Sequence, residues 1–263
     1  MKLRLFLPLI TFAGMLLLSL PALSFGPNGH RIVARIAEDH LSPEAKAAIF
    51  KITEGRHLAQ SATWPDEIRS DSGWDFAKPW HFVSIDDDES FDDYEHSDKG
   101  DILIALQKFE SILAEKKVNQ TEMWRALAFY IHFVGDIHQP LHVGRRDDYG
   151  GNKVRVKWFG RKTNLHSVWD SSLIENEQLS FREYASFLDN VTSSQIREWQ
   201  SSTYRDWATE SKSVRKQVYD LGNSSSEDPS LSYEYAYKNK ALIDDCLVKD
   251  GIRLAGKLNS LFE

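Results

Sequence analysis

The chain has 263 residues, of which 41% are hydrophobic and 27% charged, and its formal net charge is −7 at pH 7. This length can support one large hydrophobic core. The acidic balance argues against a general duplex-DNA-binding protein, because such proteins usually present a basic face. The single cysteine, Cys246, excludes an internal disulfide and is expected to be a small buried apolar residue.

Residues 1–24 are predicted to be a secretory signal peptide. Lys2 and Arg4 give a charged start, residues 5–20 are almost wholly apolar, and the small residues before Phe25 fit a cleavage site after residue 24. A retained N-terminal anchor is the alternative, but the apolar run is short for a membrane span. We therefore expect one mature domain, residues 25–263, in a monomeric protein that is not held in a membrane. Export without a disulfide is typical of a bacterial secreted or periplasmic protein.

The mature chain is predicted to be all-α. Apolar residues recur at helical spacing through most of it, and Ser42 followed by Pro43 is a typical helix start. The segment before Pro140 is mostly apolar, which predicts a buried central helix. In chain order, we expect helices around Ile32–Leu41, from Pro43, and over residues 102–113, 121–137, 181–188, 195–219 and 232–261.

Strand signals are few. Only residues 152–159 alternate, and Gly160 can turn them into a short hairpin. An acidic run, Asp86–Glu89, lies in a long loop over residues 86–98. Calcium binding is one interpretation, but the run lacks the alternation and the glycine of an EF-hand loop. A solvated loop is favoured, because clusters of like charge are usually exposed.

The most informative segment runs from His132 to His142 and holds three histidines and one aspartate in eleven residues. A second group ends with His166 and Asp170. Asp136 follows His132 by four residues, and Asp170 follows His166 by four. On a helix, residues four apart share a face and can reach one ion. Imidazole together with carboxylate suits zinc, so the two groups predict a multi-metal hydrolytic site.

Three further pieces, residues 25–30, 63–69 and 80–82, add side chains of the same kind. With the two groups above they supply five of the nine histidines and three aspartates. These are His30, Asp66, His81, His132, Asp136, His142, His166 and Asp170. In this order the pieces resemble the zinc-dependent single-strand nuclease family, which includes the fungal nucleases S-one and P-one and plant bifunctional nucleases. The resemblance implies a mostly helical fold, of the phospholipase C and P-one nuclease type, with three zinc ions in one cleft.

The resemblance also implies how the ligands divide among the three Zn²⁺ ions. One buried zinc would be held by Asp66, His81, His132 and Asp136. A second would be held by the free amine and the carbonyl of Phe25, by His30, and by Asp136 as a bridge. A third, more open zinc would be held by His142, His166 and Asp170. The family usually begins with Trp where this chain has Phe25. The ligands there are backbone atoms, so the metal chemistry is expected to survive.

Further roles follow from the same resemblance. Asp66 would orient the attacking water and act as general base. Arg69 would clamp a phosphate, although an ordinary surface arginine is the alternative. Asn152 would read the edge of a nucleobase, and Phe82 would supply an aromatic face. The expected activity is a secreted endonuclease that cleaves single-stranded DNA and RNA to 5′-phosphorylated products, with 3′-nucleotidase activity left open.

Two other classes stay open at this point. A zinc phospholipase C has a similar pattern but ends it with Glu, so the Trp169-Asp170 ending favours the nuclease. A non-catalytic zinc-binding secreted protein would be separated by a phosphodiesterase assay with a measurement of zinc content. His138 is expected to lie outside the ligand set. The remaining histidines, His40, His57 and His96, are expected at the surface.

Overall fold

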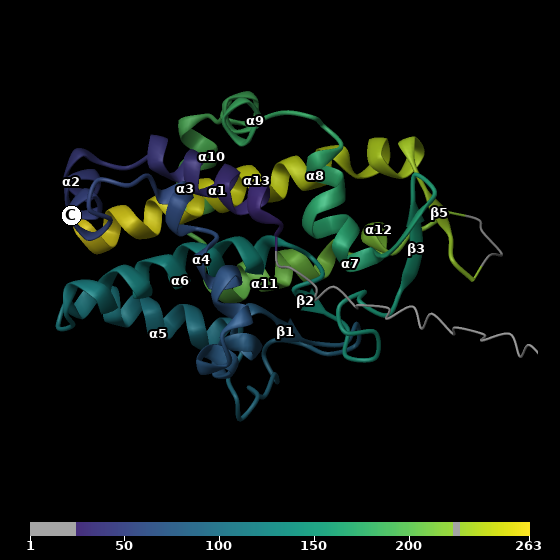
Figure 1. Ribbon diagram of the computed structural model, residues 1–263, viewed down its shortest axis with the longest axis horizontal. Helices are drawn as coiled ribbons and strands as arrows, with labels where there is room; N and C mark the ends of the chain where they lie inside the picture. The colour runs from purple at the N-terminus through teal and green to yellow at the C-terminus, as the bar shows by residue number, and fades with distance from the viewer. Residues whose placement is uncertain (1–24, 223–226) are drawn as a thin grey trace, which may run out of the picture.

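The computed structural model describes residues 25–222 and 227–263, so the predicted signal peptide lies outside the described residues. Helix α13 (Tyr233–Phe262) runs through the length of the molecule and packs along α1 (Pro27–Asp39) (Figure 1). No helix of these described ranges is long and apolar enough to cross a membrane.

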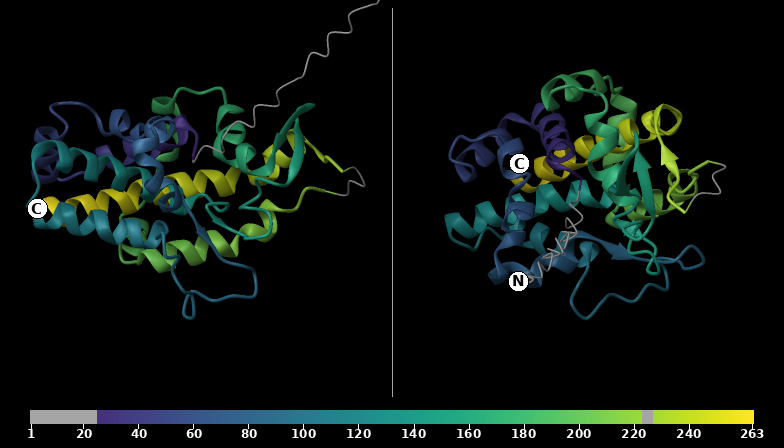
Figure 2. Two further views of the ribbon diagram at one scale, coloured as in Figure 1. Left: turned by 60° about the horizontal axis from the view of Figure 1, so that its bottom comes forward. Right: turned by 45° about the vertical axis from the view of Figure 1, so that its right-hand side comes forward.

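Helix α6 (Gln120–His138) lies beside α13 in the core, and α5 (Ile102–Glu115) covers it (Figure 2). Every residue of α6 from Ala126 to His138 is buried. A helix that is buried on all sides belongs at the centre of a domain, as its apolar sequence predicts. At its start, the side chain of Asn119 accepts a hydrogen bond from the backbone N–H of Glu122 at 3.0 Å.

Shorter helices surround this frame. Helix α2 begins as predicted, with the Ser42 hydroxyl accepting from the backbone N–H of Ala45 at 3.1 Å. The mostly helical prediction is confirmed. The shorter elements are α2 (Pro43–Ile52), α3 (Leu58–Ser61), α4 (Trp64–Glu67), the 3-10 helices η1 (Ile68–Ser70) and η2 (Ser72–His81), α7 (Leu165–Ser167), the π-helix η3 (Val168–Ser172), α8 (Leu173–Glu175) and α9 (Phe181–Leu188).

The prediction of one helix over residues 195–219 is wrong. The segment forms α10 (Ser193–Gln200), α11 (Tyr204–Ser213) and α12 (Arg215–Val218). The side chain of Thr203 accepts from the backbone N–H of Asp206, and the Asp206 carboxylate accepts from the backbone N–H of Thr203. This reciprocal cap stabilises a new helix start, because it satisfies backbone donors that a continuous helix would use otherwise. The first helix also ends earlier than predicted, at Asp39 rather than near Leu41.

The predicted hairpin is present. Strand β3 (Arg155–Trp158) pairs antiparallel with β4 (Arg161–Asn164). The two turn residues, Phe159 and Gly160, both have positive φ, at 45° and 81°, which is the geometry of a tight two-residue hairpin turn. A third short strand, β5 (Ser230–Leu231), adds in parallel to β3 and was not predicted.

A second strand pair brings two predicted ligands together. Strand β1 (Val83–Ser84) pairs in parallel with β2 (Val143–Gly144). The backbone N–H of Val83 donates to the carbonyl of His142 at 2.8 Å. His81 lies just before β1 and His142 just before β2, so this pairing aligns residues that are 61 positions apart in sequence.

The acidic loop is largely exposed, and arginines contact its carboxylates. Asp86 and Glu89 both contact the guanidinium of Arg146, and Asp87 contacts that of Arg215. The hydrogen bonds from Arg146 lower the pKa of Asp86. Arginine charges therefore offset the acidic run. The favoured interpretation, an exposed acidic loop, agrees with the exposed positions of Asp87, Asp88 and Glu89, and the arginine contacts are an addition that the sequence did not reveal.

Candidate metal centre

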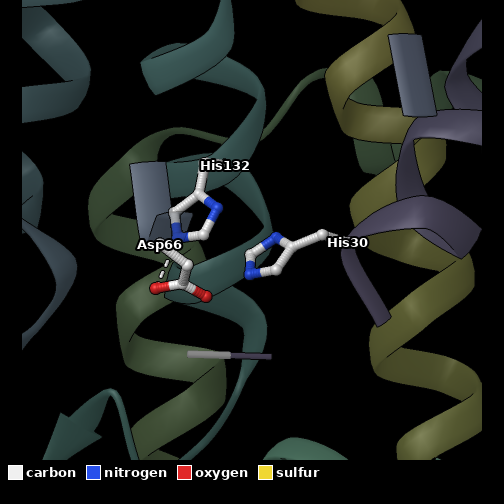
Figure 3. A group of neighbouring side chains, drawn as sticks. All are labelled: His30, Asp66 and His132. Atoms are coloured by element: carbon white, nitrogen blue, oxygen red, sulfur yellow. Dashed lines mark ion pairs between the residues drawn. The ribbon is translucent and has the colours of Figure 1, made fainter. Parts of the chain in front are cut away.

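The eight predicted ligand side chains gather into one centre, although they come from seven segments. Helix α6 provides two of them and the other segments one each. Figure 3 shows His30, Asp66 and His132 converging from α1, α4 and α6. The remaining ligands are His81 at the end of η2, Asp136 on α6, His142 before β2, His166 on α7 and Asp170 on η3.

Asp136 lies at the middle of this centre. One carboxylate oxygen is 2.9 Å from His81 Nδ1 and 3.3 Å from His132 Nε2, and the other is 3.4 Å from His30 Nε2 and 3.6 Å from His142 Nδ1. All five side chains are buried. A fully buried carboxylate among four imidazoles is expensive to form unless it serves a charged ligand.

The second predicted group forms next to the first. The two oxygens of Asp170 lie 3.5 Å from His142 Nε2 and 3.3 Å from His166 Nε2. The imidazole rings of His142 and His166 are 5.0 Å apart. The spacing of four residues between His166 and Asp170 therefore brings both side chains to one point, as predicted.

Three of the histidines are oriented by the backbone. Each places its ring Nδ1 within hydrogen-bonding distance of a carbonyl oxygen, so Nδ1 is the donor to that carbonyl and Nε2 is the nitrogen left to face a metal ion. Metal-binding histidines are commonly held in this way. The bonds are His132 to Ala62 at 2.8 Å, His142 to His81 at 2.7 Å, and His166 to Gly150 at 2.6 Å.

The residues fit metal ions. Three buried atoms that have no hydrogen-bond partner in the described structure lie here: Asp136 Oδ1, His142 Nε2 and Asp170 Oδ2. Leaving such atoms without a partner costs about 1–3 kcal/mol each. The ligand atoms fall into three groups, each within 4.8 Å: His30, Asp66 and His132; His81, His132 and Asp136; and His142, His166 and Asp170. Imidazole nitrogens and carboxylate oxygens in such sets suit zinc.

The charges of the centre are coupled. Burial raises the pKa of Asp136, but the neighbouring His132 and His142 lower it by more, so the result is well below the usual range. Burial lowers the pKa of His142, whereas Asp136 and Asp170 raise it by more, to about 9. Burial also lowers the pKa of His30, to about 4. Near neutral pH and without metal, Asp136 is therefore ionised and His142 protonated, whereas His30 is neutral and can bind a cation directly.

A cavity of about 230 Å³ opens onto this centre. Three residues with predicted roles, Arg69, Phe82 and Asn152, all line it together with His81 and His142. Arg69 Nη1 also donates to Asp66 Oδ1 at 3.2 Å, which places its guanidinium beside a predicted ligand. Phe82 is 45% exposed, which leaves a ring face available to a ligand.

Several functional neighbours were not identified from the sequence. Lys78 and Tyr149 line the same cavity. Gln139 is buried, donates from Nε2 to Asp170 Oδ1 at 2.5 Å, and accepts from the backbone N–H of Leu141 at 2.6 Å. Its place inside the His-rich segment was the only available signal.

The other histidines lie where they were expected. His138 is on α6, but its Nδ1 faces the carbonyl of Val134, and its Nε2 accepts from Arg253 at 2.9 Å. It is therefore outside the ligand groups. His40, His57 and His96 are partly or well exposed, and each lies beside a carboxylate.

Comparison with known proteins identifies the pattern. The family model described as S1/P1 Nuclease matches residues 25–263. Endonuclease 4 of Arabidopsis thaliana is 31% identical, over 92% of this chain and 90% of that protein. Nuclease S1 of Aspergillus oryzae is 30% identical, over 89% of this chain and 91% of that protein. Nuclease P1 of Penicillium citrinum is 32% identical, over 56% of this chain and 57% of that protein.

Proposed function

The chain belongs to the S1/P1 nuclease family and is a zinc-dependent, single-strand-specific nuclease, and from this premise we propose the ligands, the number of metal ions and the roles of its site residues. The proposed enzyme binds three zinc ions. Asp66, His81, His132 and Asp136 hold one. The backbone amine and carbonyl of Phe25, together with His30 and Asp136, would hold a second. His142, His166 and Asp170 hold the third.

One observation carries this proposal. Asp136 is fully buried with imidazoles on both of its oxygens, and it lies 3.6 Å from His142, which belongs to the separate group around Asp170. A single carboxylate can therefore serve two neighbouring ions, while a third ion lies close by. Phe25 supports the N-terminal ligand, because it is fully buried and its ring packs edge-on against His30.

The chain's own residues then act on the phosphodiester. Asp66 has a lowered pKa: burial raises it, but neighbouring histidines, led by His132, lower it by more. It is therefore ionised near neutral pH and can orient and deprotonate a water. Zinc supplies Lewis-acid stabilisation and a lowered water pKa when it is bound. Arg69 carries further N–H donors that can bind phosphate oxygens while Nη1 holds Asp66.

Preference for single strands follows from the cavity. Phe82 offers a ring for stacking, and Asn152 offers polar atoms to a base edge. A base in a duplex is paired and stacked, so it cannot enter such a pocket without being extruded. Stacking on an aromatic ring discriminates little between bases, so broad sequence tolerance is expected.

The test is a digest of single-stranded DNA and RNA, with and without a chelator, in which product ends and bound zinc are both determined. We expect 5′-phosphorylated fragments, loss of activity with chelator, and three zinc ions per chain by mass spectrometry. A firm value of one zinc would overturn the three-metal assignment. Hydrolysis of a phospholipid head group in place of DNA would support the phospholipase alternative, and zinc without any hydrolysis would support the non-catalytic one.

Export is part of the same proposal. The N-terminal ligand requires cleavage after residue 24, so that Phe25 carries a free amine. The family match begins at residue 25, which supports that cleavage point. N-terminal sequencing of the protein recovered from the medium or the periplasm tests it, and a chain that still carries residues before Phe25 would count against the second zinc site.

A further inference from the structure

A second cavity lies apart from the metal centre, where η2 meets α5 and α6. Its volume is about 260 Å³, and it shares no lining residue with the cavity at the metal centre. Aromatic side chains make up much of its wall. They are Trp74, Phe76, Trp80, Phe109 and Phe129.

These rings form a continuous surface. Phe76 lies between Trp74 and Trp80, with ring centres 5.6 and 5.4 Å away, and Trp80 contacts Phe109 at 5.8 Å. Phe109 and Phe129 are stacked at 4.9 Å and form the buried floor. Phe76 is 56% exposed, and Trp74 and Trp80 are half-buried. Single exposed aromatic residues are common, but a cluster of them around a cavity marks a binding site.

Two cations lie over this aromatic surface. Lys108 Nζ is 4.2 Å from the centre of the Trp80 ring, and the Arg125 guanidinium is 5.4 Å from that of Trp74. Arg125 also pairs with Glu122, whereas the described parts of the chain show no ion pair for Lys108. Glu122 also lines the cavity, so two cations and one carboxylate leave a net positive charge beside the aromatic faces, which is complementary to a ligand that is both planar and anionic.

Helix η2 lies between the second cavity and the cavity at the metal centre, and it lines both. A 3-10 helix has three residues per turn, so residues three apart lie on one side. Trp74 and Trp80 are therefore on one side, and Lys78 and His81 are on another. Lys78 and His81 line the cavity at the metal centre, and Trp74 and Trp80 line the second one. The two cavities are the two sides of one short wall.

We propose that this second cavity is an accessory site for the single-stranded nucleic acid substrate, which binds a base of the strand that flanks the cleaved bond. The base stacks on the ring of Phe76 or Trp74, and Lys108 and Arg125 bind neighbouring phosphates. Stacking on aromatic side chains together with cations along the backbone is how proteins hold single strands without sequence preference. The proposal rests on the proposed nuclease function and extends its substrate site beyond the metal centre.

The test compares a long substrate with a short one. A 20-nucleotide single strand can reach both cavities, whereas a dinucleotide occupies only the metal centre. The variants Phe76→Ala and Lys108→Gln are at exposed positions and are not in the metal centre. Phe76→Ala should raise KM for the long strand about fivefold, the lower end of what loss of one stacked base costs. Lys108→Gln should also raise KM for the long strand, because it removes a phosphate contact. Kinetics on the dinucleotide should not change.

Matched controls come from α2, which contributes no residue to either cavity. Phe50→Ala removes a ring that is 64% exposed, and Lys46→Gln removes an exposed charge. Both should leave KM unchanged. Lys108→Gln, but not Lys46→Gln, should also reduce the slope of log KM against log salt concentration by about 0.7, the value for one lost phosphate contact on a single strand.

A direct binding measurement separates this proposal from the proposed function. A fluorescent phosphorothioate strand, which resists hydrolysis, is titrated by anisotropy into the wild type and each variant. Weaker binding by the two cavity variants supports the accessory site even if the wild type cleaves nothing, an outcome that would overturn only the nuclease mechanism. Equal binding and equal KM would overturn the accessory site. An equal increase in KM on the dinucleotide and on the long strand would show that the substituted residue has only a structural role. Binding of an apolar peptide, without binding of the strand, would assign the cavity to a different partner.

Discussion

Substitution of Gly135 by alanine should remove zinc from the centre while leaving the fold nearly intact. Gly135 lies on α6 between the ligands His132 and Asp136 and faces the ring of His30. A Cβ at this position would sit 2.8 Å from His30 Nδ1 and 3.1 Å from His30 Cε1. The ring cannot easily give way, because it is stacked on His132 with ring centres 3.8 Å apart.

The size of the effect follows from these distances. To reach an ordinary contact of 3.4 Å, the His30 ring must move by about 0.6 Å from the added carbon, whereas metal sites require ligand distances within about 0.2 Å of their ideal values. We therefore expect at least about a tenfold loss of zinc affinity, comparable to the loss of a group that orients a metal ligand. The fold should suffer less. Overpacking costs about 1–3 kcal/mol, and alanine is favoured over glycine in a helix by about 1 kcal/mol.

The assay measures the two effects separately. Bound zinc is counted by mass spectrometry after dialysis against increasing chelator, and thermal unfolding is followed in fully chelated protein. Gly256→Ala on α13 is the matched control, since its Cβ would meet the exposed Gln200 side chain at 2.6 Å and no ligand. If Gly135→Ala holds zinc as firmly as the wild type, then His30 is not a tightly positioned ligand. A chelated variant that is unfolded at room temperature would refute the energetic comparison.

Three further predictions concern the ligands. Asp136→Asn should lose two zinc ions and Asp170→Asn only one, because Asp136 is proposed to bridge; equal losses would contradict the division of ligands. At the same zinc concentration in the buffer, a protein that retains Met before Phe25 should bind one zinc ion fewer than a correctly processed protein and lose most of its activity. Equal hydrolysis rates for the two proteins would disprove the N-terminal ligand. In chelated protein the pKa of His142 is raised to about 9, above its value of about 6.5 in the unfolded chain. Protonation of His142 therefore stabilises the fold fully below a pH of about 6.5, and this stabilisation is lost as pH rises through 9. Zinc must displace that proton, so affinity at the site of His142 and His166 should rise about tenfold per pH unit from 7 to 9, and a flat titration would rule this out.

Local sequence patterns predicted much of the centre, because several ligands are set by short-range geometry. His132 and Asp136 are four apart on a helix whose apolar sequence requires burial, so both side chains are carried into the core together. His142 follows closely, because Pro140 ends the helix and turns the chain back beside it. In these cases the spacing predicts that the side chains lie near one another, and the structure brings them together.

Other features depend on contacts between distant segments, so periodicity could not reveal them. Gly135 matters because α1 brings His30 against it, and nothing near Gly135 in the sequence signals that approach. The pairing of β1 with β2 involves only two residues on each strand, too few for a strand pattern. The break between α10 and α11 came from a cap at Thr203, whose local hydrogen bonds override an otherwise helical sequence.

The electrostatics of the centre indicate how it stays assembled when zinc is removed. The lowered pKa values of Asp66 and Asp136 keep both carboxylates ionised, and the pKa values of His132 and His142 are raised, chiefly by these carboxylates acting against the effect of burial. Shifts in these directions mean that the buried carboxylates and imidazoles stabilise one another's charged forms when no metal ion is bound. The same imidazoles become neutral ligands once a divalent ion takes over that role. Metal binding at this centre is therefore an exchange of protons for zinc within a preformed set of side chains, and acid should compete with zinc before it disrupts the fold.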